Sequence, residues 1–332
     1  FLILLIQAWN ELKEPANSET GYPFMTVLIS VRNEVANLPG LIDCLENQTY
    51  APDNFEVVFI DDNSEDGTYE HLMDFSKTSK LSIRVYKLEA DDKDKISHKK
   101  AAISHCVTKY SGEFIILTYG DVSFGRYWIQ SFANVFQRTD SKFISGPVVM
   151  DSYSYTDDIQ SLEFSSLIGA GAAAIYYNNP VLCNGANLAF KKEAFMDVNG
   201  YEGYEKIISG DDEFLMYKVW KLYQSKIFFL KSEKAIVHVQ PESIVNEFYH
   251  QRRRWSGKWR KHPNPLSKVL ALYVFLSNLS FLLLLILGIL ILLPVYTVIL
   301  LLAIKLLLEF VYFKQMYLVF INNLKILTFL IS

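Results

Sequence analysis

Cysteine is scarce in this chain: Cys44, Cys106 and Cys183 lie far apart and form no CxxC pair. This odd, dispersed set excludes a disulfide framework and a cysteine zinc site, and it predicts reduced thiols in a cytosolic compartment. Excess positive charge is also missing, because the formal net charge is -4, which argues against general nucleic-acid binding. The sequence has no internal repeats and no low-complexity linker.

Charge of either sign is missing from one long segment. Of 332 residues, 51% are hydrophobic, and no residue from Val269 to Ile304 is charged. One helix of this length would extend about 54 Å, whereas the bilayer core is about 30 Å thick. We therefore expect two membrane spans, broken near Pro294, rather than one span or a buried core helix.

The two ends of the chain are apolar as well. The first residues, FLILLIQAW, are too few to span a bilayer and predict the end of an N-terminal transmembrane helix, cut at its beginning, over residues 1–12. A signal-peptide remnant is the alternative. Residues 266–332 are expected to hold two transmembrane helices and the start of a third. Lys305 and Glu309, four residues apart, predict an ion pair that faces protein, unless the span ends there and both side chains snorkel.

The first half alternates apolar runs with helical patterns. Four strands are expected, followed by helices that predict βαβ units and a mostly parallel sheet: Met25–Val31, Phe55–Ile60, Ile83–Leu88 and Glu113–Thr118. The second half is less regular. We expect a strand over Lys142–Met150, a helix over Asp157–Tyr177, a short strand and loop over Asn184–Phe190, and a helix that begins near Gly210.

Acidic loops follow two of these strands, at the ends where parallel sheets bind ligands. Asp61 and Asp62 are either ordinary turn residues or carboxylates that accept hydrogen bonds from a nucleobase imide or a ribose. Asp121 is either the N-cap of a helix that begins near Arg126 or an oxygen ligand for Mg²⁺ or Mn²⁺.

Two helix starts carry further polar groups. Asp211 and Asp212 open a helix, where carboxylates suit the helix dipole or act as a general base for a sugar hydroxyl. Lys99 opens another helix and is either solvated or bound to phosphate. His238 and His250 have no partner pattern, so we expect them to be structural.

The segment Gln251-Arg252-Arg253-Arg254-Trp255 precedes the uncharged run. It is either a positive-inside anchor or a site where arginine and tryptophan hold a pyrophosphate and stack on a sugar ring. The cations up to Lys268 predict that residues from about Pro23 to Pro265 lie on the cytoplasmic side of the inner or plasma membrane.

The order of these elements resembles the inverting family 2 glycosyltransferases, the group of cellulose, chitin and hyaluronan synthases. The resemblance covers about Pro23 to Leu293, and the QxxRW element followed by spans is its most specific part. It implies an α/β fold of the GT-A type, Rossmann-like with a mostly parallel sheet, over residues 23–265, ending in an interfacial QRRRW helix. The implied partners are a nucleotide-diphosphate sugar, commonly a UDP-sugar, a growing polysaccharide or lipid-linked acceptor and the bilayer, without nucleic acid.

The resemblance also implies roles for individual residues. Asp212 matches the catalytic base, with Asp211 as the second candidate, and Asp121 matches a metal ligand. The implied donor-nucleotide residues are Asp61, Asp62, Asp66, Lys99 and Tyr119. The residues that match the diphosphate and acceptor-sugar positions are Gln251, Arg254 and Trp255.

One position departs from the family pattern. The metal-binding DxD motif reads Tyr119-Gly120-Asp121 here, so its first carboxylate is missing. We therefore expect poor affinity for free Mg²⁺ or Mn²⁺, and activity that needs metal at about millimolar concentration. The alternative from another class is a catalytically impaired relative that serves as a membrane scaffold or regulator.

Overall fold

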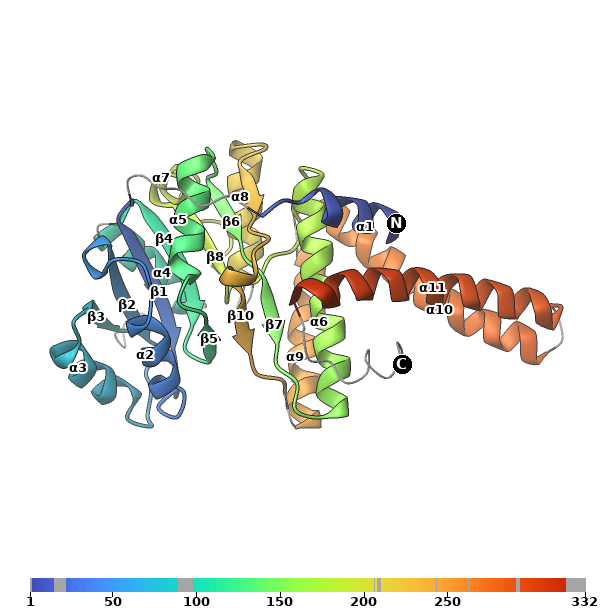
Figure 1. Ribbon diagram of the computed structural model, residues 1–332, viewed down its shortest axis with the longest axis horizontal. Coiled ribbons are helices and arrows are strands. Elements are labelled where there is room, and N and C mark those ends of the chain that lie inside the picture. The colour runs from blue at the N-terminus through green and yellow to red at the C-terminus, as the bar shows by residue number, and fades with distance from the viewer. Residues whose placement is uncertain are drawn as a thin grey trace.

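The computed structural model describes residues 2–14, 22–88, 98–110, 112–205, 207, 210–242, 244–261, 263–290 and 293–320. In this part of the chain, a domain of sheets and helices adjoins a block of long helices, two of which project away from the body (Figure 1). The expected start of a third transmembrane helix, after residue 320, lies outside the described residues.

A seven-stranded sheet forms the centre of the domain. Its order is β3 (Ser82–Lys87), β2 (Phe55–Asp61), β1 (Met25–Val31), β4 (Phe114–Tyr119), β8 (Leu188–Lys191), β6 (Phe143–Ser145) and β9 (Ile227–Phe229). Only β8 runs antiparallel to its neighbours, and the other pairings are parallel. The expected α/β architecture with a mostly parallel sheet is confirmed. The apolar runs of β1 and β2 are buried on both faces, as continuous apolar strands of parallel sheets usually are.

The register brings the two acidic loops together. β1 lies between β2 and β4, with Val31 opposite Asp61 and Ser30 opposite Tyr119. These three parallel strands therefore end at one edge of the sheet, where the loops after β2 and β4 meet. The helices that connect them are α2 (Leu38–Glu46), α3 (Thr68–Thr78) and α4 (His98–Lys109).

The expected strand over Lys142–Met150 is wrong as a single element. It divides into β6 and β7 (Val148–Met150), which belong to different sheets. Gly146 and Pro147 separate them, and proline lacks the N–H that a continuous ladder needs. β7 joins a second sheet of three strands with β10 (Val237–Val239) and β5 (Val122–Phe124).

Asn187 connects the two sheets. This side chain has no exposed surface. Its Nδ2 donates to the carbonyl oxygens of Pro147 at 2.6 Å and Ala235 at 2.8 Å. Its Oδ1 accepts from Trp128 Nε1 at 2.9 Å. A Cβ on Gly146 would lie 2.4 Å from Asn187 Nδ2, so the chain crosses between sheets where only glycine fits.

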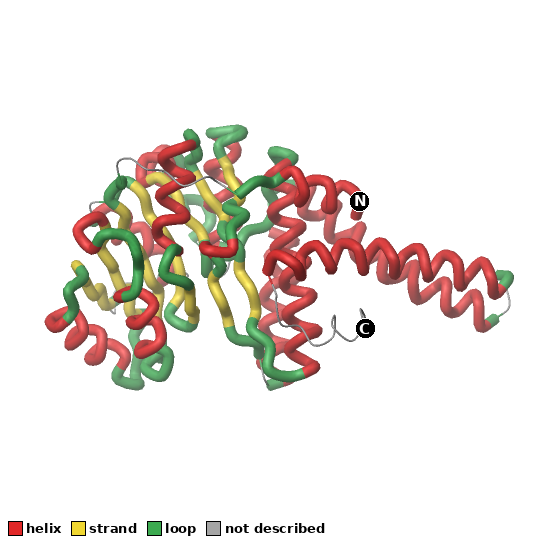
Figure 2. The backbone as a smooth tube through the Cα atoms, in the orientation of Figure 1, coloured by secondary structure: helices red, strands yellow, loops and turns green. Residues whose placement is uncertain are grey.

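Two long helices, α6 (Tyr155–Tyr176) and α9 (Val245–Lys261), lie between the sheets and a projecting hairpin (Figure 2). An ion pair of 2.8 Å joins Arg252 of α9 to Glu163 of α6. Phe164 of α6 packs against Trp255 of α9, with ring centroids 5.9 Å apart.

The projecting hairpin consists of α10 (Pro265–Ile289) and α11 (Val295–Phe320). Both are long and apolar enough to cross a membrane, over Pro265–Ile289 and Val295–Gln315. The expected break near Pro294 is confirmed. The Lys305–Glu309 ion pair is also confirmed at 3.5 Å, and Lys305 Nζ donates to the Ser277 carbonyl of α10 at 3.0 Å.

The N-terminal helix, α1 (Leu2–Glu11), packs against α6 and α11. Lys231 holds the end of this helix, because its Nζ donates to the carbonyl oxygens of Trp9 at 2.6 Å and Leu12 at 3.0 Å. Cations suit a helix C-terminus, where carbonyl groups lack partners within the helix. That α1 is the end of a transmembrane helix stays a prediction.

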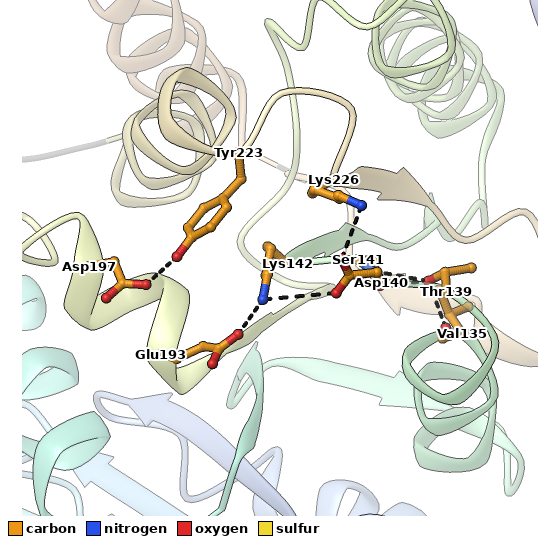
Figure 3. Close-up of polar contacts among 9 residues, drawn as sticks. All are labelled: Val135, Thr139, Asp140, Ser141, Lys142, Glu193, Asp197, Tyr223 and Lys226. Atoms are coloured by element: carbon orange, nitrogen blue, oxygen red, sulfur yellow. Dashed lines mark hydrogen bonds and ion pairs between the residues drawn. The ribbon is translucent and has the colours of Figure 1, made fainter.

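A cluster of polar side chains lies where β6 and β9 of the large sheet begin (Figure 3). Lys142, which precedes β6, pairs with Glu193 of α7 (Lys192–Asp197) and with Asp140. Tyr223, which follows α8 (Asp211–Leu222), donates to Asp197. Exposed ion pairs contribute at most about 1 kcal/mol each, so we interpret this cluster as structural.

Candidate active site

The loop after β2 carries a buried carboxylate, Asp61. Its side chain has no exposed surface, and its Oδ2 accepts from the Ser64 backbone N–H at 3.3 Å. Its Oδ1 has no hydrogen-bond partner among the described residues. Leaving such an atom unsatisfied costs about 1–3 kcal/mol, which a ligand N–H would relieve. Asp62 beside it forms a 3.6 Å ion pair with Arg32.

Asp66 braces the same loop. Its Oδ1 accepts from the backbone N–H of Thr68 at 3.0 Å and from the Thr68 hydroxyl at 2.6 Å. Its Oδ2 accepts from the Val35 N–H at 3.0 Å. The Thr68 hydroxyl bond is the main cause of the lowered pKa of Asp66. These bonds indicate a structural role, and contact with a ribose stays a prediction.

Asp121 lies between β4 and β5. Tyr127 occupies the N-cap of the next helix, α5 (Trp128–Arg138), so the alternative that Asp121 caps this helix is wrong. The side chain reaches solvent, but the surrounding protein desolvates the carboxylate and raises its pKa. Asp121 is therefore an exposed carboxylate at the edge where β1, β2 and β4 end, and its role as a metal ligand stays a prediction.

A second carboxylate, Glu34, comes close to Asp121. A Cβ on Gly120 would lie 2.8 Å from Glu34 Cγ. Burial raises the pKa of Glu34, a hydrogen bond from Asn37 opposes this shift, and the charges of Asp121 and Asp66 add to it. The loop after β1 thus supplies a carboxylate beside the one that follows β4.

Asp121 and Glu34 are two carboxylates that could hold a metal. Within the described part of the chain, no group of three or more His, Cys, Asp and Glu side chains is arranged to bind an ion. Mg²⁺ is usually held by one or two carboxylates together with substrate phosphates, and Mn²⁺ also prefers oxygen ligands. Asp121 and Glu34 fit a divalent metal that binds together with a diphosphate.

Tyr119, at the end of β4, lies within a charged group. Lys99 Nζ is 3.9 Å from the centre of the Tyr119 ring and forms a 3.0 Å ion pair with Asp211 Oδ2. Burial raises the pKa of Tyr119 well above its usual value, and the carboxylates of Asp211 and Asp212 raise it further. The phenol therefore stays protonated. The structure brings together four of the predicted site residues here.

Asp212 is held rigidly at the start of α8. It is 6% exposed. Its Oδ2 accepts from the Gly185 N–H at 2.9 Å, and its Oδ1 accepts from the Glu213 N–H at 2.9 Å. The carboxylate is thus fixed in one orientation at a helix N-terminus, as a general base must be when its substrate arrives.

Gly185 lies between Asp212 and Tyr119. A Cβ at this position would lie 2.0 Å from Tyr119 Oη and 3.6 Å from Asp212 Oδ2. The Tyr119 hydroxyl therefore points toward the loop that holds the carboxylate. Contact between Tyr119 and the donor ribose stays a prediction.

The QRRRW residues lie on α9. Gln251 Nε2 donates to Glu242 at 3.0 Å, while its Oε1 has no hydrogen-bond partner among the described residues. Arg254 is exposed, and the Trp255 ring contacts Phe164 of α6. Gln251 and Arg254 thus keep polar atoms for a ligand, whereas Trp255 has a packing role that its sequence position did not predict.

Three residues of the site escaped prediction from the sequence: Glu34, Gly185 and Tyr201. Tyr201 is 3% exposed, and the carboxylates of Asp211 and Asp212 lie close enough to raise its pKa further after burial has raised it. The Asn33-Glu34 pair directly after a strand could have indicated Glu34. No local pattern marks the other two, because their surroundings come from distant segments.

Comparisons with known proteins identify the family. The chain matches the model described as "Glycosyl transferase family 2" over residues 26–198, just over half its length, and "Glycosyl transferase family group 2" over residues 125–323. Among curated proteins it resembles the glycosyltransferase AglE of Haloferax volcanii, with 28% identity over 127 residues, 38% of this chain. The match spans only 40% of that relative.

Solved structures show the same fold. The mannosyltransferase PcManGT from Pyrobaculum calidifontis, in complex with GDP-Man and Mn2+, matches with a TM-score of 0.60 and 18% identity, over 81% of this chain and 75% of that one. Residues 1–349 of S. aureus TarS match with a TM-score of 0.50 and 18% identity, over 65% and 60%. The expected GT-A type fold is confirmed, and the chain belongs to glycosyltransferase family 2.

Proposed function

We propose that this chain is a membrane-bound, inverting glycosyltransferase that moves a sugar from a nucleotide-diphosphate sugar, a UDP-sugar, to a growing polysaccharide or lipid-linked acceptor. The observation that carries the proposal is the buried Asp212 carboxylate, fixed by the backbone amides of Gly185 and Glu213. A base held in this way needs no reorganisation before it accepts a proton.

The reaction is a single displacement. The acceptor hydroxyl attacks the anomeric carbon in line with the departing nucleoside diphosphate, and Asp212 accepts the hydroxyl proton. Because one displacement suffices, the anomeric centre inverts, and no second carboxylate is needed as a nucleophile, unlike in retaining glycoside hydrolysis.

Cationic side chains of this protein neutralise the negative charge on the leaving diphosphate. Lys99 lies at the start of α4, over Tyr119, and Arg254 is exposed on α9. Arginine binds phosphate oxygens through two parallel hydrogen bonds. Mg²⁺ or Mn²⁺, held by Asp121 and Glu34, would supply further positive charge at the leaving group.

The donor nucleotide is assigned to the loop after β2. The free Oδ1 of the buried Asp61 suits an N–H of a nucleobase, and Asp62 is available beside it. PcManGT is described in complex with GDP-Man and Mn2+, and TarS with UDP-GlcNAc. These complexes support a nucleotide-sugar donor.

The membrane assignment rests on the hairpin. α10 and α11 are long, mainly apolar helices that project from the body (Figure 1). The cations of α9 lie before α10 and favour a cytoplasmic catalytic domain. We propose residues 23–265 as the catalytic domain with an interfacial α9, residues 266–332 as membrane helices, and residues 1–12 as the end of another.

A catalytically silent scaffold is the second candidate, favoured by Tyr119 in place of a metal-binding carboxylate. Nucleotide release from a panel of UDP- and GDP-sugars by the purified full-length protein, with Mn²⁺ or Mg²⁺, separates the two. Release that disappears in Asp212→Asn supports the transferase. No release from any donor, by the wild type or by Tyr119→Asp, supports the scaffold.

A further inference from the structure

Tyr201 is fixed beside the catalytic carboxylate. It lies in the loop between α7 and α8, directly after Gly200, whose φ of 48° is left-handed. Its ring meets the ring of Phe195 edge-on, with centroids 5.5 Å apart. A Cβ on Gly200 would lie 2.6 Å from Phe195 Cζ, so the turn that presents Tyr201 is tightly packed. This packing restricts the orientation of the Tyr201 side chain.

The Tyr201 hydroxyl lacks a partner. The residue is 3% exposed, and its Oη has no hydrogen-bond partner among the described residues. A buried tyrosine hydroxyl normally finds a partner, and one left without it is costly. A group that binds to the free enzyme from outside would satisfy this hydroxyl.

The charged residues around the Tyr201 hydroxyl indicate which kind of ligand can bind there. Lys100 Nζ lies 6.0 Å from the centre of the Tyr201 ring and 5.6 Å from that of Phe214, which follows Asp212 by two residues, so Tyr201 lies near the start of α8. The charges of Asp211 and Asp212 there raise the pKa of Tyr201 further, after burial has raised it. Lys99 offsets the charge of Asp211, with which it pairs, but the charge of Asp212 still disfavours a phosphate or another anion beside the hydroxyl. A neutral hydroxyl can accept the Tyr201 hydrogen bond and can donate its own proton to a carboxylate.

We propose that Tyr201 Oη holds the attacking hydroxyl of the acceptor sugar beside Asp212. The inference rests on the proposed transferase function and deepens it, because it separates the acceptor site from the donor site. Tyr201 donates to the acceptor oxygen, and that oxygen's own proton then faces Asp212. The ligand at this position is a sugar hydroxyl, or a water molecule when the donor is hydrolysed.

Hydrolysis provides a test that needs no knowledge of the acceptor. In the absence of an acceptor, water attacks the donor and the nucleotide is released. Tyr201→Phe removes only the hydroxyl. We expect kcat for nucleotide release to fall about tenfold, with the donor KM unchanged. The melting temperature should stay the same or rise, because the variant loses an unsatisfied buried group.

Tyr223→Phe is the matched control. Its hydroxyl bonds Asp197 in the surface cluster (Figure 3), so its removal should leave kcat and KM unchanged. An unchanged kcat in Tyr201→Phe would overturn the proposal. A lower melting temperature together with lower kcat would also overturn it, since the hydroxyl would then have a structural partner. A raised donor KM at unchanged kcat would place Tyr201 in the donor site instead. If the wild type releases no nucleotide from any donor, the transferase function itself fails, and this proposal fails with it.

Discussion

Gly185 offers a sharp test of the site because it lies between Asp212, the proposed base, and Tyr119. The added methyl of Gly185→Ala would lie 2.0 Å from Tyr119 Oη and 2.9 Å from Tyr119 Cζ. Ordinary contact begins at 3.4 Å, so the hydroxyl must move by about 3.4 − 2.0 = 1.4 Å, or the loop must retreat. The loop cannot retreat freely, because its N–H at this position donates to Asp212.

Two effects follow from this displacement. Overpacking of this kind costs about 1–3 kcal/mol of stability, and each kcal/mol lowers the melting temperature of a domain of this size by about 2–4 °C. A shift of about 1 Å at a catalytic group lowers turnover about 100-fold. We therefore expect Gly185→Ala to lose both stability and nucleotide release, with turnover the more affected.

Thermal melting and nucleotide release are measured for Gly185→Ala, Tyr119→Val and the double variant. Valine cannot reach Gly185, so Gly185→Ala should cost less than about 0.5 kcal/mol in that background, which gives a coupling energy of at least about 0.5 kcal/mol. Gly125→Ala is the control, because nothing lies within 4 Å of its added Cβ. If Gly185→Ala costs the same in both backgrounds, the Tyr119 hydroxyl does not lie against this loop.

Three further predictions follow from the proposed function. Asp212→Asn should lower nucleotide release by about 10²–10⁴-fold while donor binding by calorimetry stays nearly intact, because the change keeps the shape and removes the basicity; normal turnover would place the base elsewhere. Asp121→Ala should abolish transfer and Tyr119→Asp should lower the Mn²⁺ concentration that supports it, whereas full activity in Asp121→Ala would contradict the metal assignment. The protein should stay with membranes in alkaline carbonate, and its release would rule out α10 and α11 as spans.

The elements that follow from local pattern could be predicted well. Met25–Val31 is a strand with the expected bounds, because a continuous apolar run suits a strand buried on both faces. The acidic loops could be placed at strand ends, and parallel pairing then brought Asp61 and Tyr119 to one edge. The two long apolar helices were equally clear from the absence of charge.

The remaining features depend on contacts between distant segments. Predicting that Lys142–Met150 divides into two strands requires knowledge of which sheet each half joins. Within the segment, only Gly146-Pro147 indicated a break. Tyr201 and Gly185 come together around Asp212 only in the folded chain, so no spacing in the sequence indicates either. The contact of the Trp255 ring with α6 becomes visible only when the helices pack, and a role of this ring at the acceptor sugar stays a prediction.

The bonds of Asn187 bear on how the enzyme admits its substrates. Separating the large sheet from the small one would break the two hydrogen bonds that Asn187 Nδ2 donates to Pro147 and Ala235, and it would disturb a buried amide that also accepts from Trp128. Each buried polar group that such a movement leaves without a partner costs about 1–3 kcal/mol. Asp212 lies at the start of α8, which contacts β9 of the large sheet, and Asp121 directly precedes β5 of the small one. The bonds of Asn187 therefore oppose relative movement of these two carboxylates. Under the proposed function, substrates would then be admitted by movement of the loops, and the distance between Asp212 and Asp121 would be set by the folded core before any ligand arrives.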